Sequence, residues 1–261
     1  MADFWNAWSW NPIIGALLAL AGWRYMDGVW RLWRRAGTGR GVRRWQVAAF
    51  WGGWIALFIA LISPLETYST ASLAMHMIQH LLLMLIAPPL LVLGLPPRAV
   101  LGMIPMPWRH PLVRWWQRQT GLRQLWHMLT ETWVAWGVYA LVLWGWHLPP
   151  LYQLAVENTL VHMLEHASFF GAAFLFWQGL EAQLGLGVLA IFTTAVHSSI
   201  LGALMTFSTQ IWYPVYGSLE DQQIAGLIMW MPGGIIFVIA GLVVMGRWLH
   251  EMEVMDAKNR V

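Results

Sequence analysis

Cysteine is absent from this 261-residue sequence, which excludes both a disulfide framework and a thiolate metal site. Charged residues are also scarce, at 10% of the chain, whereas a soluble domain carries about 25%. Lys258 is the single lysine, so the net charge of +3 rests on arginine; we interpret it as a signal of membrane topology and not of nucleic-acid binding. Hydrophobic residues reach 59% and the mean hydropathy is +0.55, which is typical of a chain that folds in a lipid bilayer.

Seven apolar stretches have the length of roughly 20 residues that a membrane-spanning helix needs. They cover about residues 11–32, 45–63, 72–95, 131–148, 159–179, 186–208 and 222–247. Because no long polar stretch separates them, we predict an all-α, polytopic membrane helix bundle that forms one domain over residues 1–261. Pro88 and Pro89 fall inside the third stretch and predict a kink there.

The loops between these stretches alternate in charge. Arginines gather between the first and second stretches and between the third and fourth. The loops after the second, fourth and sixth stretches carry acids instead, namely Glu66, Glu157, Glu220 and Asp221. By the positive-inside rule, this pattern predicts an external N-terminus and a cytoplasmic C-terminus. In the second basic loop, residues 111–129 mix tryptophan, leucine and arginine, which favours a helix lying in the membrane interface.

Four histidines form two near-copies of one pattern. HMIQH at 76–80 and HMLEH at 162–166 each place two imidazoles four residues apart, on one face of a helix. This spacing lets a single helix offer two nitrogen ligands to one metal ion. A lone helical histidine is more often a hydrogen-bonding group, but ionisable groups inside a membrane are costly and tend to mark function. We therefore predict a metal site formed by His76, His80, His162 and His166.

His147 and His197 are predicted to lie in the same layer of the membrane. The helical rise places His80 and His166 roughly 10–12 Å, and His197 roughly 15 Å, below the outer surface. His147 closes the fourth stretch at that surface. Four methionines of the outer half are predicted as auxiliary ligands: Met84, Met205, Met229 and Met231. Thioethers favour Cu(I) and imidazole suits copper, zinc and iron, so we expect copper, as Cu(I), with zinc as an alternative.

Glu165 lies between the two histidines of the second copy and leaves several roles open. It could orient an imidazole, carry a proton or act as a general base, since HMLEH also matches the H-x-x-E-H string of inverted zinc peptidases. An intramembrane zinc hydrolase is therefore one alternative. Gln79 occupies the equivalent place in the first copy, which favours a shared ligand role over catalysis, and we do not expect an enzyme. Haem b is a further alternative, although neighbours four residues apart cannot both ligate one iron axially.

Two long segments carry a family resemblance. MHMIQHLLLMLIAPPLLVLGLPPR and WHLPPLYQLAVENTLVHMLEHASFF resemble the CtaG family of caa3-type cytochrome c oxidase assembly factors. The matching positions are His76, His80, His147, His162 and His166, with Glu165 between the last two. The resemblance implies a multi-pass protein of the bacterial plasma (inner) membrane that is needed to assemble the oxidase and has a proposed role in supplying copper to its catalytic subunit.

Residues and resemblance together predict a copper-binding metallochaperone. We expect it to accept copper from the outer aqueous side, where periplasmic copper donors would supply it, and to release it to the nascent catalytic subunit of cytochrome c oxidase. Exchangeable ligation by histidine and methionine suits such a transfer. An assembly scaffold that binds no metal is the remaining alternative.

Overall fold

A computed structural model describes residues 7–181 and 183–259, and in this part of the chain all regular structure is helical. The all-α prediction is therefore confirmed. The elements are α2 (Pro12–Ala36), α3 (Arg44–Leu61), α4 (Pro64–Ser69), α5 (Leu73–Leu81), the π-helix η1 (Leu82–Ile86), α6 (Ala87–Gly94), α7 (Pro97–Met103), α8 (Met106–Arg118), α9 (Thr120–Leu129), α10 (Thr132–Trp146), α11 (Pro149–Glu157), α12 (Thr159–Gly179), α13 (Leu184–Phe207) and α14 (Leu219–Asn259).

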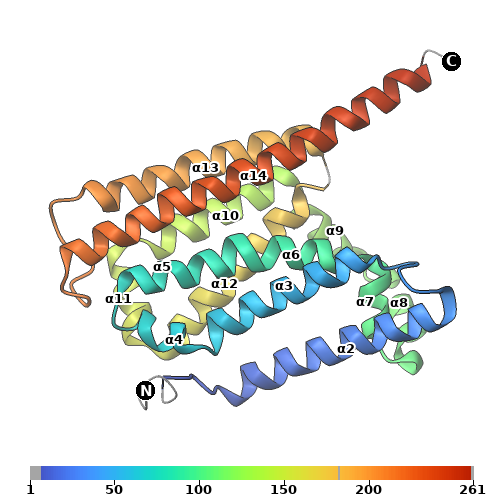
Figure 1. The fold of residues 1–261 in the computed structure, drawn as a ribbon, viewed down its shortest axis with the longest axis horizontal. Helices are drawn as coiled ribbons and strands as arrows, with labels where there is room; N and C mark the ends of the chain where they lie inside the picture. Colours follow the sequence, from blue (N-terminus) through green and yellow to red (C-terminus); the bar gives the residue numbers. More distant parts are fainter. Residues whose placement is uncertain (1–6, 182, 260–261) are drawn as a thin grey trace.

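The helix formed by α5, η1 and α6 runs through the middle of the bundle (Figure 1). It packs against α3 on one side and against α14 on the other, and α14 in turn pairs with α13. Helices α10 and α12 pack together beside it, and α2 lies at the edge against α7. The first predicted histidine pair therefore lies on the central helix and the second on a neighbouring one.

At the predicted kink, the central helix forms the π-helical turn η1. Pro88 has no backbone N–H, so the carbonyl of Met84 loses its helical partner. The indole Nε1 of Trp177, on α12, donates a hydrogen bond to that carbonyl at 3.0 Å. The prolines are thus tolerated because a neighbouring helix satisfies the freed backbone group, and this bond also ties α12 to the central helix.

Among the described residues, five helices are long and apolar enough to cross a membrane: Arg44–Leu61, Leu73–Gly94, Thr159–Gly179, Leu184–Phe207 and Leu219–Lys258. They are compatible with a multi-pass membrane protein. Of the two other predicted spans, α10 has 15 residues, fewer than the roughly 20 that a span needs, and α2 carries Arg24, Asp27 and Arg31 within its length. The count of seven spans and the orientation of the termini therefore stay predictions.

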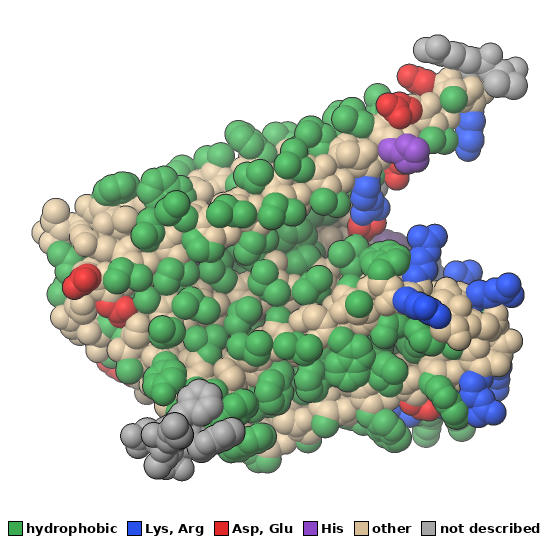
Figure 2. All heavy atoms as spheres, viewed as in Figure 1, with side chains coloured by type: hydrophobic (Ala, Val, Ile, Leu, Met, Phe, Trp, Pro, Cys, Tyr) green, Lys and Arg blue, Asp and Glu red, His purple; other side chains and the backbone are tan. Residues whose placement is uncertain are grey.

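The two ends of the bundle differ in charge. Hydrophobic side chains cover its flanks, and basic side chains, which are arginines here, gather at the end where α7 and α8 lie (Figure 2). We call this the arginine end and define it by Arg31, Arg35, Arg98 and Arg109. The opposite end, with α4 and α11, is the acidic end, defined by Glu66, Glu157 and Asp221.

Two sets of short helices differ in detail from the expected pattern. Residues 111–129 fall in two helices, α8 and α9, because Gln119 leaves the helical conformation with φ −85° and ψ 75°. Every side chain in these two helices is at least partly exposed. At the acidic end, α4 and α11 occupy what the sequence suggests are loops. Their short length explains why hydropathy alone does not find them.

Candidate metal centre

His76 and His80 lie on the buried face of α5 and are 2% and 5% exposed. The carboxylate of Asp221, at the start of α14, accepts hydrogen bonds from the Ser72 hydroxyl and the Leu73 backbone N–H. A carboxylate at this position stabilises the helix N-terminus and fixes the start of α5 against α14. One turn apart on the buried face, the Nε2 atoms of His76 and His80 approach to 2.8 Å.

The second pair, His162 and His166, lies on α12 and faces the first. Asn158 caps this helix by accepting two hydrogen bonds from backbone N–H groups of its first turn. The ring centroids of His162 and His166 are 4.1 Å apart. The ring of His166 lies 5.9 Å from that of His76 and 5.6 Å from that of His80. The structure therefore brings the two predicted pairs into one cluster.

Glu165 lies at the centre of this cluster and is fully buried. Its Oε1 atom is 3.8 Å from Nε2 of His80, and its Oε2 atom is 3.9 Å from Nε2 of His76. Ligand atoms of His76, His80, Glu165 and His166 all lie within 4.8 Å of one another, and we call these four residues the inner group. Imidazole nitrogens and a carboxylate oxygen at such spacing could hold one metal ion.

Several polar atoms of the inner group have no hydrogen-bond partner in the described part of the chain. They are Nδ1 of His80, Nε2 of His166 and both carboxylate oxygens of Glu165. An unsatisfied buried polar group costs about 1–3 kcal/mol. The free atoms of His166 and Glu165 could ligate an ion, and the free Nδ1 of His80 lets that ring carry its hydrogen there and offer Nε2, so the residues fit a metal.

A second group of ligands lies nearer the surface. Atoms of Glu66, His162 and His166 lie within 4.8 Å of one another, and we call these residues the outer group. The side chains of Glu66 and His162 are 23% and 15% exposed. Burial raises the pKa of Glu66, and a hydrogen bond from the Gln79 amide opposes that shift. His166 belongs to both groups. The ligands therefore form a continuous series from the partly exposed Glu66 and His162 to the fully buried Glu165.

Tyr216 sets the orientation of His76. Its hydroxyl donates to the Ser69 carbonyl at 3.1 Å and lies 3.0 Å from Nδ1 of His76. The single hydroxyl hydrogen serves the carbonyl, so the Tyr216 oxygen accepts a hydrogen bond from Nδ1–H of His76. This tautomer leaves the Nε2 lone pair of His76 directed at the inner group. Tyr152, on α11, contacts Tyr216 through their hydroxyls at 3.2 Å.

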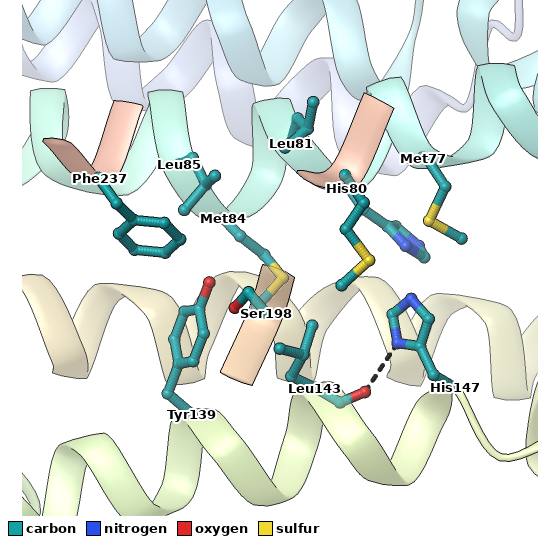
Figure 3. A pocket seen from close by; sticks show the side chains of 11 residues that line it. Met77, His80, Leu81, Met84, Leu85, Tyr139, Leu143, His147, Ser198 and Phe237 are labelled. Atoms are coloured by element: carbon teal, nitrogen blue, oxygen red, sulfur yellow. Dashed lines mark hydrogen bonds between the residues drawn. The ribbon is translucent and has the colours of Figure 1, made fainter. Parts of the chain in front are cut away.

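His147 adjoins the inner group across a small cavity of about 30 Å³ (Figure 3). Its Nδ1 donates to the Leu143 carbonyl at 2.7 Å, and its Nε2 has no partner among the described residues. The rings of His147 and His80 both point into the space between them, with centroids 6.2 Å apart. The thioethers of Met77, Met84 and Met229 also line this cavity. Two predicted auxiliary ligands, Met84 and Met229, thus lie beside His80.

Among the described residues, the remaining predicted ligands belong to neither the inner group nor the outer group. His197 lies on α13 beside two tryptophans, and its Nδ1 accepts a hydrogen bond from Trp144 at 3.4 Å. Met205 is buried in an apolar cluster with Tyr152. Met231 is 56% exposed. A position along a helix fixes depth but not the direction in which a side chain points, and these three residues point elsewhere.

The fold and the site define an all-helical protein with several helices of membrane-spanning length and a buried histidine–carboxylate cluster that could hold a metal ion. The model of the cytochrome c oxidase caa3 assembly factor (Caa3_CtaG) family matches residues 23–251, and the chain belongs to this family. The resemblance found in the sequence is confirmed, and membership implies an interaction with the oxidase. No curated protein and no solved structure matches the chain.

Proposed function

We propose that this assembly factor binds copper as cargo inside the membrane and delivers it to the nascent catalytic subunit of cytochrome c oxidase. The inner group is the observation that supports the proposal, because three imidazoles and a carboxylate converge in the interior with unpartnered ligand atoms in the described structure. Polar groups in a membrane interior are normally paired with one another. Ligand atoms held apart from protein partners are expected where a cargo ion completes the site.

Copper, as Cu(I), suits the chemistry of these residues better than the alternatives. The cavity that joins His80 to His147 is lined by three thioethers, which are soft ligands that favour Cu(I). Zinc would use the nitrogen and oxygen ligands but gain nothing from methionine. Haem b is disfavoured because a cavity of about 30 Å³ accommodates an ion or a water molecule and not a macrocycle.

The two groups suggest a route for the ion. Copper from periplasmic donors would first meet Glu66 and His162, the two partly exposed ligands of the outer group. His166 belongs to both groups, so the ion would pass to the inner group without losing all its ligands. His80 then connects the inner group with His147 and the methionine-lined cavity. Release would follow by exchange with ligands of the oxidase subunit.

The proposal places the protein in the bacterial plasma (inner) membrane with seven spans, by adding α2 and α10 to the five long apolar helices. In α2, Arg31 pairs with Asp27 at 2.8 Å and Arg24 donates to the Met103 carbonyl, which lowers the cost of burying these charges in a bilayer. The N-terminus is then external and the arginine end cytoplasmic. We take residues 1–261 as one domain, with α8 and α9 lying in the membrane interface.

Metal analysis of the full-length purified protein tests this proposal. Chelator-stripped protein is loaded with Cu(I) under reducing conditions or with zinc, and bound metal is measured by mass spectrometry. The wild type is compared with a variant in which His76, His80, His162 and His166 are replaced by alanine. The control replaces His110, His127 and His250, which are exposed histidines outside both groups. We expect copper to be lost from the first variant and retained by the second.

The delivery step needs a readout in cells. In bacteria that depend on this protein, His80→Ala combined with His166→Ala should lower the copper content of the oxidase, and the triple control should not. Normal copper loading with the double variant would overturn the chaperone proposal and favour a metal-free scaffold. Tight binding of zinc with no copper would favour a zinc hydrolase in which Glu165 acts as base. In the function proposed, the protein delivers an ion and is not an enzyme.

A further inference from the structure

A cavity of about 180 Å³ opens at the arginine end, between α2 and the α7–α8 segment. Four arginines line it, together with three apolar residues that include Leu101 and Met106, both more than 40% exposed. The arginines are Arg31, Arg35, Arg98 and Arg109. The four arginines of this cavity surround one concave surface, whereas the other arginines of α8 and α9 are exposed and lie outside it.

The cavity is formed by close packing of two backbones. A Cβ atom on Gly28 would lie 2.6 Å from the carbonyl carbon of Gly102, so α2 and α7 meet where neither has a side chain. Arg31 and Arg109 both donate through Nη2 to the Gly102 carbonyl, at 3.1 and 3.0 Å. These bonds cap the C-terminal end of α7 and hold two guanidinium groups at the wall of the cavity.

The positive charge around this cavity is poorly compensated. Asp27 is the one carboxylate seen to pair with its arginines in the described residues, at 2.8 Å from Arg31. In the same part of the chain, Arg35 and Arg98 have neither an ion pair nor a side-chain hydrogen bond, and the buried Nε of Arg31 has no partner. Burial, followed by the charge of the neighbouring arginines, lowers the pKa of Arg109. A bound anion would relieve this repulsion.

We propose that the cavity binds a phosphate-bearing anion, presented as the headgroup of an anionic phospholipid. Guanidinium groups match phosphate oxygens in pairs, and several of them converge on one cavity here. Leu101 and Met106 provide apolar contacts that a free phosphate would not use but that the glycerol and acyl chains of a lipid would. The positive-inside rule explains why arginines lie at this end, as it does for Arg114 and Arg118, but not why four of them surround a cavity.

Lipid titration of the full-length protein tests this inference. Protein stripped of lipid in detergent receives phosphatidylglycerol, phosphatidylcholine with the same acyl chains, or inorganic phosphate, and native mass spectrometry counts the bound molecules. The test variant is Arg35→Gln with Arg98→Gln, because neither side chain is hydrogen-bonded within the described structure. The control is Arg114→Gln with Arg118→Gln, which removes the same charge from exposed positions outside the cavity. Size-exclusion chromatography verifies that both remain folded.

We expect the wild type to prefer phosphatidylglycerol and the test variant to bind it roughly 25-fold more weakly, at about fivefold for each arginine. The control should stay close to wild type. Binding of inorganic phosphate with the same dependence on Arg35 and Arg98 would support the site with a soluble anion as its ligand. Equal losses in both variants, or equal binding of the two lipids, would overturn the proposal.

Discussion

The Nε2 atoms of His76 and His80 face each other at 2.8 Å in the interior of the bundle. One of the two must carry a hydrogen and the other accept it. Since Tyr216 holds the hydrogen of His76 on Nδ1, His80 is the donor. A metal ion between the rings needs both lone pairs, so binding requires the hydrogen of His80 to leave Nε2. The Nδ1 atom of His80, which has no partner among the described residues, can take it.

Replacement of Glu165 by methionine should stabilise the metal-free protein and abolish its response to metal. Both oxygens of Glu165 are buried without a hydrogen-bond partner in the described structure. Removal of such a group by an apolar side chain of similar shape should increase the free energy of unfolding by about 1–3 kcal/mol. Thermal unfolding in detergent, with and without Cu(I), measures both effects. Glu157→Met, at an exposed position, is the control; a less stable Glu165→Met protein that still responds to Cu(I) would contradict the prediction.

Tyr216→Phe should weaken metal binding without changing the number of ions bound. The hydroxyl of Tyr216 fixes the tautomer of His76, and loss of a partner that orients a ligand lowers metal affinity by roughly 10–100-fold. Competition with a chromophoric Cu(I) chelator measures the change. Tyr68→Phe removes a hydroxyl from a residue that is 45% exposed and should leave affinity unaltered. If both variants bind like the wild type, Tyr216 has no such role.

The features that depend on a single helix could be predicted from the sequence. A four-residue spacing places His76 and His80 on one face of any helix, and the same holds for His162 and His166. The apolar stretches likewise gave the all-α fold and most of the helix bounds. In both cases the signal is local, because helical periodicity and hydropathy need no knowledge of neighbouring elements.

Features that depend on how helices are rotated and on short segments could not be predicted. The depth of His197 along its helix predicts a place in the site, but α13 turns its side chain toward Trp144. Glu66, on α4, lies beside His162, and Tyr216, from the segment before α14, contacts His76. In each pair the two residues are far apart in the sequence. Glu66 is the single charged residue between the second apolar stretch and His76, and this isolation is the one signal in the sequence that could have indicated a ligand there.

Glu66→Gln should slow the uptake of copper more than it changes the final occupancy. The variant keeps an oxygen that can accept the hydrogen bond from Gln79 but loses the negative charge of the outer group, while the inner group stays intact. Loss of an attracting charge at a binding site lowers association rates by roughly tenfold. Stopped-flow mixing with a Cu(I) complex gives the rate. Glu157→Gln removes an exposed charge from the same end, and equal rates in the two variants would show that the outer group does not receive the ion.

Glu181→Gln should reduce stability at neutral pH but not in acid. Both oxygens of Glu181 accept hydrogen bonds from Arg247, at 2.6 and 2.8 Å, and these bonds lower the pKa of Glu181. A folded-state pKa below the unfolded value, about 4.3 for glutamate, means that the pair stabilises the protein above that pH and loses its effect as the pH falls through the folded pKa. The side chains of Arg247 and Glu181 are 43% and 40% exposed, so the ion pair should contribute less than about 1 kcal/mol to the free energy of unfolding.

Thermal unfolding of wild type and Glu181→Gln at about pH 7 and about pH 3 measures this difference. The gap in Tm should be present at the higher pH, shrink in about 1 M salt and close at the lower pH. Glu253→Gln removes an exposed carboxylate of α14 that has no ion pair among the described residues, so it should leave Tm unchanged at either pH. A gap between wild type and Glu181→Gln that persists at about pH 3 would mean that Glu181 stabilises the turn after α12 by packing and not through its charge.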